Sequence, residues 1–481
     1  MSDIGRHGRN VSWLFAAELA QKVLSLALFV YLTRKLDVHG NSAYGVFATV
    51  LPFFVTLLNM GYYEVLVRDI AKRPDDARSF MANAIAGQSA LFVPVLIVVC
   101  IAVQWTNFSD TLETIVVLAV VTALLHAITK VHYAALAAHE QFRAISTLNI
   151  WLRFAIVCVS LTLLYLDFGV VALVACYIPC YALQVLLARR SAIATTAANP
   201  VEWSATRQRY LVREGAPMAV SGIVASCYFA LDLPLLEGYG HGAIAGHYAI
   251  GLRFLLLMMT FSDLIAAVLY PIFSRKAMQS ADDQRAALGI GLKASALFAV
   301  PALIGIAVLN HGVVALIAGP ANLPSAPAVL GFTFVFLCEM LTRNLVDFLR
   351  SHNRQRTPMA IYAVALVAKM IAAFAIMQWV SEPFLPLLFV NVLIAPAIAI
   401  AHLIAMRMYR PDLRVPALAV AMIGRPVLAG LAMGFVLLWL KAVPVLLAIV
   451  LGGLVYGLFA VLFGAIGSFE RDLMRKTLRI G

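Results

Sequence analysis

The residues of this sequence that could do chemistry are charged side chains that interrupt long apolar stretches. A charge at the centre of a membrane helix costs at least about 2.5 to 3.5 kcal/mol on insertion scales, so such groups usually face a water-filled cavity or one another. Cations in a cavity favour an anionic ligand, because phosphate oxygens accept paired hydrogen bonds from Arg and attract Lys as a point charge. The cations are Lys22, Lys130, Arg153, Arg253, Arg343 and Lys369, and the acids are Glu18, Asp232, Asp263, Glu339 and Asp347.

Two sets of these charges are spaced for pairing along one helix face. Glu18 and Lys22 are four residues apart, and the same spacing separates Glu339, Arg343 and Asp347. Residues at positions i and i+4 are neighbours on the surface of a helix. Each set is either a self-satisfied structural pair or part of a transport pathway, and the sequence leaves both interpretations open.

Other charges lack a partner on their own helix. Asp232 and Arg253 are predicted at similar depths on consecutive helices, where they would form either an outer gate or an ordinary salt bridge. Lys130, Arg153 and Lys369 have no such neighbour. For Lys130 and Arg153 the alternative to anion binding is that each side chain extends to the nearby membrane surface.

The elements that must position these residues are membrane-spanning helices. Hydrophobic residues make up 63% of the 481 residues and charged residues 12%, whereas about a quarter of an ordinary soluble protein is charged. About 20 apolar residues in a helix cross the hydrocarbon core, and backbone groups there must be satisfied within the segment. We predict an all-α integral membrane protein with about 14 spans, at 11–33, 43–66, 80–103, 111–137, 147–166, 170–188, 214–236, 247–272, 287–310, 326–350, 359–380, 384–406, 423–440 and 444–467.

The distribution of Lys and Arg predicts the orientation of these spans. Of the 36 such residues, 27 lie in the tails, in alternate connections or at the helix ends beside them. Only Arg34, Lys35 and Lys441 lie on the opposite side. Cytoplasmic loops carry the excess of positive charge, so both termini are expected in the cytoplasm. The net charge of +12 therefore indicates topology and contact with anionic membrane lipids, and no nucleic-acid partner is expected.

The sequence predicts a transporter and not an enzyme. The ATP-binding pattern G-x-x-x-x-G-K-[ST] is absent, and the connections are too short for a catalytic domain. All six cysteines fall within predicted spans, where they are expected to be small packing residues. No cofactor and no metal site are expected.

Two short motifs indicate an internal duplication. Gly45-Val46-Phe47-Ala48 matches Gly246-His247-Tyr248-Ala249, and Asp75-Asp76-Ala77-Arg78 matches Asp282-Asp283-Gln284-Arg285. An even number of spans per half keeps both halves in one orientation, which is a parallel repeat. We expect an N-terminal lobe of six spans at 1–200, a C-terminal lobe of six at 201–410, and a helix pair with a tail at 411–481. The pair carries Gly430-x-x-x-Gly434 and Gly453-x-x-x-Gly457, typical of close helix packing.

The sequence resembles the polysaccharide transporter family of the MOP superfamily, which contains the O-antigen and exopolysaccharide flippases. The resemblance in layout covers nearly the whole chain, and its motifs are short. They are Leu32 to Leu36 with Tyr44 to Phe47, Tyr228 to Asp232, Gly246 to Ala249, Leu252-Arg253, and Tyr270 to Arg275. The resemblance implies a flippase that carries a polyprenyl-diphosphate-linked oligosaccharide across the bacterial cytoplasmic (inner) membrane by alternating access, in the synthesis of lipopolysaccharide or another surface polysaccharide.

By position, the resemblance implies roles for the charges within the spans. The substrate-binding candidates are Lys22, Arg253, Arg153 and Lys369, and the coupling-ion or gate candidates are Asp232, Asp263, Glu18, Glu339 and Arg343. The partners implied are the lipid-linked glycan, membrane lipids, a polysaccharide polymerase and glycosyltransferases. The alternative is a cation-coupled multidrug antiporter of the related multidrug branch, which a carboxylate-led cavity would suit better than these cations.

Overall fold

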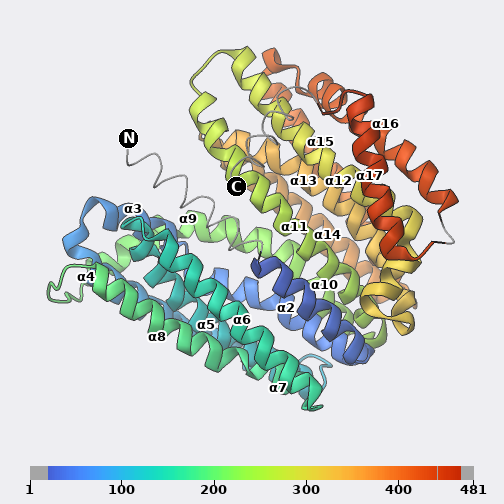
Figure 1. Cartoon of the computed structure of the whole chain (residues 1–481). Helices are drawn as coiled ribbons and strands as arrows, with labels where there is room; N and C mark the ends of the chain where they lie inside the picture. The colour runs from blue at the N-terminus through green and yellow to red at the C-terminus, as the bar shows by residue number, and fades with distance from the viewer. Residues whose placement is uncertain (1–19, 441–442, 467–481) are drawn as a thin grey trace. The chain divides into compact units, whose positions relative to one another are not determined.

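The computed structural model describes residues 20–440 and 443–466 (Figure 1). This part of the chain is almost entirely helical and contains no strand, which confirms the all-α prediction. It packs into two compact units that adjoin in sequence at Ala249 and Ile250. The predicted lobe boundaries near residues 200 and 410 remain a prediction, because a repeat is defined by symmetry and these units by packing.

The first unit contains ten helical elements after an initial helix over residues 20–35. They are α2 (Val38–Asn59), α3 (Tyr62–Lys72), η1 (Pro74–Asp76), α4 (Ala77–Gln104), α5 (Asp110–Ala138), α6 (Phe142–Tyr165), α7 (Gly169–Ala175), α8 (Tyr177–Thr195), α9 (Ala205–Ala230) and α10 (Asp232–Gly238).

The unit boundary falls within one long helix, α11 (Gly242–Lys276). The second unit then continues through the rest of the described chain. Its remaining elements are α12 (Ala281–Ala318), η2 (Pro320–Ser325), α13 (Ala326–Ser351), α14 (Arg356–Trp379), α15 (Phe384–Tyr409), η3 (Pro411–Leu413), α16 (Val415–Trp439) and α17 (Val445–Leu462).

The number of helices agrees with a multi-span membrane protein. Twelve helices among the described residues are long and apolar enough to cross a membrane, and the bent pair α9 and α10 brings the number to 13. The first predicted span, 11–33, lies partly outside the described residues, and its described part is helical from residue 20. These findings fit the expected total of about 14.

The second predicted span is broken in the structure. Its single expected helix, 43–66, is two helices, α2 and α3, because Met60 and Gly61 both have positive φ angles, 48° and 69°. A Cβ atom on Gly61 would lie 2.3 Å from the carbonyl oxygen of Gly215 on α9. A glycine therefore serves two purposes here, since it permits the left-handed turn and the close approach of two backbones.

The seventh predicted span is also not a straight helix. Residues 214–236 were expected to form one span, whereas α9 and α10 meet at an angle of 50° near Leu231. The helix α9 also begins earlier than expected, because Ser204 caps its first turn by accepting a hydrogen bond from the backbone N–H of Arg207. The start of α9 therefore lies well before the apolar segment.

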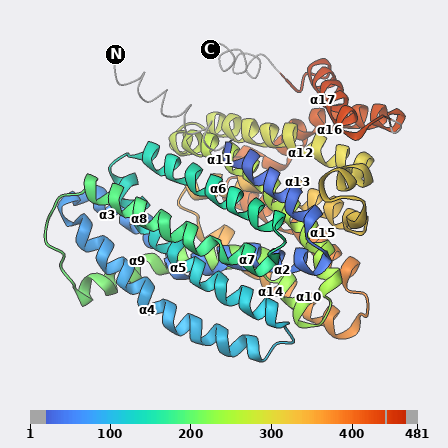
Figure 2. The same ribbon diagram turned by 60° about the horizontal axis from the view of Figure 1, so that its bottom comes forward.

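Helix α5 is the centre of the first unit. It packs against α2, α4 and α8, and α4 and α5 run side by side in Figures 1 and 2. In the second unit α12 has the corresponding role, with α13, α16 and α17 around it. Lys130 lies on α5 itself, and Glu339 and Arg343 lie on α13, which packs on α12.

The small residues of α16 allow close packing, as expected, but against α12 and not against the other helix of the predicted pair. Gly430 and Gly434 face α12, because a Cβ on either would lie within 3 Å of the Ile304 side chain. Gly453 and Gly457 on α17 have no atom within 4 Å of such a Cβ. The two C-terminal helices do contact each other, but the glycines of α16 serve the packing on α12.

Candidate functional site

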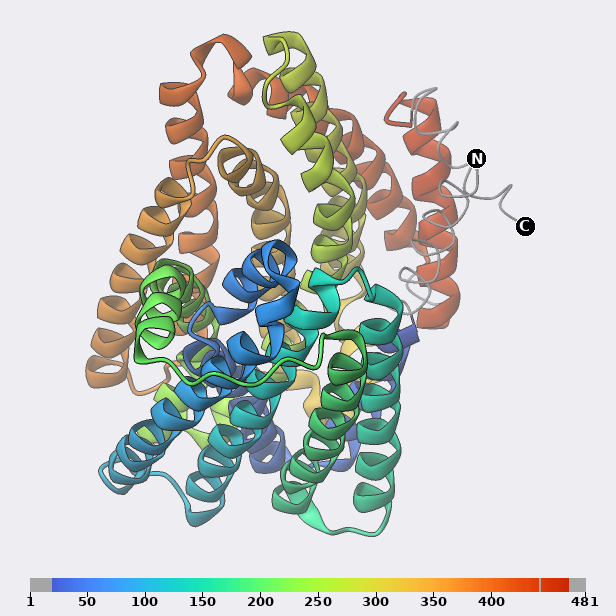
Figure 3. The same ribbon diagram turned by 90° about the vertical axis from the view of Figure 1, so that its left-hand side faces the viewer.

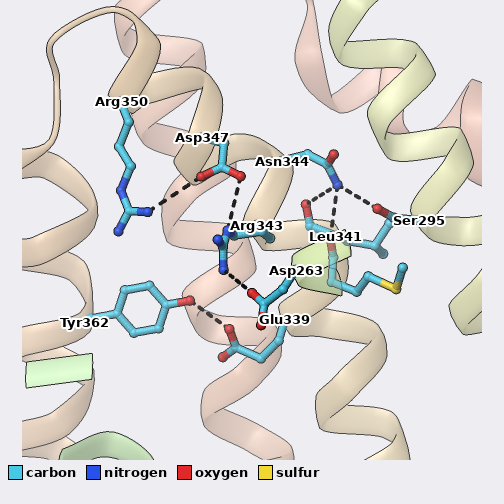
Figure 4. Close-up of polar contacts among 10 residues, drawn as sticks. Asp263, Ser295, Glu339, Leu341, Arg343, Asn344, Asp347, Arg350 and Tyr362 are labelled. Atoms are coloured by element: carbon cyan, nitrogen blue, oxygen red, sulfur yellow. Dashed lines mark hydrogen bonds and ion pairs between the residues drawn. The ribbon is translucent and has the colours of Figure 1, made fainter. Parts of the chain in front are cut away.

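A row of charges on α13 forms an ion-pair network in the second unit (Figure 4). Arg343 Nε donates a hydrogen bond of 3.1 Å to Asp347 Oδ2, one turn further along the helix. Arg350 Nη1 lies 3.6 Å from the other oxygen of Asp347. Asp347 is buried and therefore depends on these two cations, because a buried carboxylate is stable only when it is paired.

Two neighbouring helices complete this network. Asp263 on α11 accepts a hydrogen bond from Arg343 Nη1 at 3.3 Å, and the Tyr362 hydroxyl of α14 donates one to Glu339 at 2.7 Å. Figure 4 shows these groups converging on the same part of α13. Lys369, also on α14, has a side chain that is only 1% exposed, and its charge acts on Glu339.

The α13 network is balanced in charge. Its acids are Glu339, Asp347 and Asp263, and its cations are Arg343, Arg350 and Lys369. Such an arrangement suits a group that exchanges a proton or a small cation, because a change at one carboxylate is felt by the others. Within the described ranges, no three His, Cys, Asp or Glu side chains are placed to hold a metal ion.

The cations of the first unit are in a different environment. Lys130 on α5 and Arg153 on α6 have no hydrogen-bond or ion-pair partner among the described residues. The charge of Glu64 acts on Lys130 from beyond ion-pair distance, and the charge of Arg153 acts on the hydroxyls of Tyr177 and Tyr181 of α8. Two cations without a bonded acid can attract an anion that brings its own negative charge.

Aromatic side chains line this part of the first unit. The hydroxyls of Tyr44 on α2 and Tyr177 are 2.8 Å apart, and the rings of His126 and Tyr181 have centroids 4.9 Å apart. Tyr177 also packs edge-on against Phe47. The sequence did not indicate these tyrosines as site residues, because an aromatic residue in an apolar helix carries no spacing signal for a site.

Two of the predicted site residues, Lys22 and Glu18, lie near the beginning of the chain. Lys22 is half-buried on the helix over residues 20–35, and it interacts with other groups of the structure. Glu18 lies outside the described residues. The expected pairing of Glu18 with Lys22 therefore stays a prediction.

Asp232 is held in the first unit by a tyrosine. It is 2% exposed and accepts a hydrogen bond of 2.6 Å from the Tyr248 hydroxyl. Arg253, which is 7% exposed, falls in the second unit. The predicted gate between Asp232 and Arg253 remains a sequence prediction.

The two copies of the repeated Gly-x-aromatic-Ala motif pack on each other. A Cβ on Gly45 of α2 would lie 2.5 Å from the Cβ of Ala249 in the first turns of α11, and one on Gly246 would lie 2.2 Å from the Val38 carbonyl oxygen. Only glycine allows these helices to approach so closely. The repeated motifs indicated a duplication in the sequence, whereas their contact is visible only in the structure.

Known proteins resemble this chain in sequence and in fold. A model of the family described as polysaccharide biosynthesis protein matches residues 32–327. No curated protein matches the chain. Its fold is similar to an inward closed conformation of the lipid II flippase MurJ, with a TM-score of 0.73, 13% identity, and coverage of 96% of this chain and 99% of MurJ.

Multidrug transporters share the fold as well. An inward-facing multidrug resistance MATE family transporter of the MOP superfamily has a TM-score of 0.68 and 13% identity, over 82% of this chain and 95% of its own. A mutant of the Vibrio cholerae MATE transporter VcmN has a TM-score of 0.56 and 14% identity, over 83% and 98% of the two chains. At such identities the likeness establishes a common architecture.

Proposed function

The chain belongs to the polysaccharide biosynthesis protein family, and from this premise we propose that it is a flippase for a polyprenyl-diphosphate-linked oligosaccharide. The substrate would cross the cytoplasmic (inner) membrane of a bacterium by alternating access, for assembly of a surface polysaccharide such as O-antigen or an exopolysaccharide. MurJ, whose fold this chain shares, is by its name a flippase for lipid II.

The observation that carries this proposal is the pair of cations without bonded acids in the first unit. Lys130 and Arg153 have no hydrogen-bond or ion-pair partner among the described residues, although each lies in a membrane-spanning helix. A cation at this depth without an ion pair is expensive unless a cavity or an anion accompanies it. A diphosphate is a suitable anion, because its oxygens accept hydrogen bonds from Arg in pairs.

The aromatic residues beside these cations are suited to the sugar portion of the substrate. Tyr44 on α2 and Tyr177 and Tyr181 on α8 form a cluster of rings and hydroxyls beside Arg153. A tyrosine combines an apolar ring with a polar tip, and sugars likewise carry both apolar faces and hydroxyl groups. We assign substrate contact also to Lys22, Arg253 and Lys369, from their positions in the sequence.

The α13 network is our candidate for ion coupling. Glu339, Arg343 and Asp263 link α11, α13 and α14 through bonds that change when a carboxylate gains a proton or a cation. A ligand shifts a conformational equilibrium only by binding two states with different affinity. These paired groups provide such a difference, because protonation removes the negative charge on which Arg343 depends.

The competing function is a cation-coupled multidrug antiporter, which would share the fold. A cationic drug would be repelled by Lys130 and Arg153, which have no ion pair in the described structure. The matching family is one of polysaccharide biosynthesis, and this also favours the flippase. The proposed partners are a polysaccharide polymerase and glycosyltransferases that make and use the same glycan.

Transport by purified protein in liposomes tests the function. We expect a labelled polyprenyl-diphosphate oligosaccharide to cross the bilayer, and the double variant Lys130→Gln with Arg153→Gln to reduce the rate at least about tenfold. The matched control is Arg143→Gln, which removes an exposed cation at the beginning of the same helix α6 and is expected to leave the rate unchanged. Equal transport by the double variant, or efflux of cationic dyes with no movement of glycan, would overturn the proposal.

The orientation is proposed from the distribution of Lys and Arg. Both termini and the connection between α8 and α9 are expected in the cytoplasm. A cysteine in place of Ser280, between α11 and α12, should react with impermeant thiol reagents only after lysis. Its labelling in intact spheroplasts would contradict this orientation.

A further inference from the structure

A cationic pocket lies at one end of the first unit, where α3 ends and α4 and α9 begin. It has a volume of about 530 Å³ and is lined by Lys72, Arg73, Phe80, Ser204 and Arg207 among others. Ligand pockets commonly have volumes of about 300 to 1,000 Å³. The pocket is therefore large enough for a charged headgroup.

Two cations of this pocket are not bonded to an acid. The acid that lines it, Asp69, is already occupied, because it accepts a hydrogen bond from Arg68 Nε at 2.8 Å and another from the Tyr210 hydroxyl at 2.8 Å. Among the residues that the structure describes, the side chains of Lys72 and Arg73 have no hydrogen-bond or ion-pair partner. Two positive charges are thus available to a ligand.

Arg207 supplies a third charge in a fixed position. Its guanidinium lies over the Phe80 ring, with its carbon 4.8 Å from the ring centroid, and its Nη2 is 3.6 Å from Asp76. Its Nη1 is buried, and no acceptor for it lies in the described part of the chain. A buried donor without an acceptor is costly, so an acceptor from a ligand would stabilise this arrangement.

One wall of the pocket is a chain segment that specific hydrogen bonds hold in place. The extended stretch between α8 and α9, visible in Figure 3, is tied to α4 at three points. Ser79 Oγ accepts from the Glu202 N–H at 3.0 Å, and Asn83 donates to the Glu202 carbonyl at 2.8 Å and accepts from the Ser204 N–H at 3.2 Å. The part of the wall that carries Ser204, next to Arg207, is therefore fixed against α4.

The position of the pocket indicates a membrane lipid as the ligand. The candidate span that includes α4 begins at Pro74, so the pocket lies at the end of a membrane-crossing helix. Trp203, 68% exposed, and the exposed Val201 project from the adjoining stretch. Exposed Trp residues are enriched where helices meet the membrane surface, and basic pockets between membrane helices bind lipid headgroups.

We propose that this pocket binds the phosphate of an anionic phospholipid headgroup. Lys72 and Arg73 attract the phosphate from the end of α3, and Arg207 donates to it from the beginning of α9. The bound lipid joins α3 to α9 in addition to the existing protein contacts. This binding does not depend on the flippase function, and a protein that moved no glycan would show it equally.

Binding of phosphatidylglycerol and phosphatidylcholine to the full-length protein, measured by native mass spectrometry in a neutral detergent, tests the proposal. We expect phosphatidylglycerol to bind at least about tenfold more tightly, because the choline cation of phosphatidylcholine cancels the charge of its phosphate and is repelled by the three cations of the pocket. The variant Lys72→Gln, Arg73→Gln and Arg207→Gln should lose this preference. The control variant Arg190→Gln, Arg209→Gln and Arg213→Gln removes the same charge from exposed positions outside the pocket and should retain it within about twofold.

A second variant blocks the pocket without removing any charge, so it tests the proposal even if the triple variant fails to fold. Thr206→Trp keeps every charge and fills the pocket with a bulky ring, so it should also abolish the preference. Equal loss in the control variant would mean that diffuse surface charge binds the lipid and would overturn the proposal. Displacement of the lipid by an equal concentration of inorganic phosphate or pyrophosphate would overturn it too, because the site would then serve a soluble anion.

Discussion

The two units hold their membrane charges in opposite ways. In the second unit, α13 and its neighbours arrange three acids and three cations in one network around Arg343. In the first unit, Lys130 and Arg153 lie near aromatic side chains with no bonded acid in the described structure. Paired charges can stabilise or switch a conformation, whereas unpaired cations can receive an anionic substrate. We therefore propose that coupling depends mainly on the paired charges of the second unit, and that the diphosphate is bound mainly by the two cations of the first.

The largest effect is expected from breaking the α13 network. Arg343→Gln leaves Asp347 and Asp263 without their shared cation, and we expect a loss of about 3 kcal/mol in the free energy of unfolding, at the lower end for buried pairs because Arg343 is partly exposed. Thermal unfolding in detergent measures this. Adding Asp347→Asn should restore part of the loss, and an unrestored double variant would show that the charges act separately.

Arg350→Gln is the matched control on the same helix. Arg350 is more exposed and lies 3.6 Å from Asp347, so we expect a loss below about 1 kcal/mol. A loss as large as that of Arg343→Gln would mean that the network is not centred on Arg343.

A smaller effect is expected from the single hydrogen bond at the other end of the network. Tyr362→Phe removes the donor to Glu339, which is buried, and should cost about 1 to 2 kcal/mol of stability. The control variant Tyr165→Phe, at the exposed end of α6, should leave the free energy of unfolding unchanged. No loss in Tyr362→Phe would show that Glu339 is satisfied by its other neighbours.

Removal of the unpaired cation should scarcely affect stability. Arg153→Gln breaks no ion pair of the described structure, so the free energy of unfolding should change by no more than about 0.5 kcal/mol, or rise, while glycan transport falls. Arg153→Lys keeps the charge and loses the paired donors, and it should recover part of the transport. A destabilisation comparable to that of Arg343→Gln would show that Arg153 is a structural charge, and it would contradict the proposed difference between the two units.

The smallest effect is expected for Asp69, a paired carboxylate outside the spans, when the pH is changed. Burial alone would raise the pKa of Asp69, but the hydrogen bonds from Arg68 and Tyr210 lower it overall. A lowered pKa means that its stabilisation is complete above the ordinary Asp pKa of about 3.9 and is lost as pH falls below it. The cost of Asp69→Asn should therefore be the same at pH 5 and pH 8, and a marked difference would contradict this.

The sequence alone determined the helical class, the approximate ends of most spans and the inventory of charges. The tenth predicted span, 326–350, is α13 (Ala326–Ser351), and the twelfth, 384–406, is α15 (Phe384–Tyr409). Apolar length is a local property, because each span must satisfy its own backbone in lipid. The family resemblance was equally visible in short stretches of sequence and is confirmed.

Only the tertiary structure decided which partner each of these residues has. The break at Gly61 depends on the backbone of Gly215, and the α16 glycines serve α12 and not α17. The spacing of Glu339 and Arg343 allowed a pair along their own helix, but Glu339 accepts its hydrogen bond from Tyr362 of another helix. The basic pocket likewise joins residues more than 100 positions apart. Such neighbours arise from packing between distant segments, which the order of residues along one helix cannot encode.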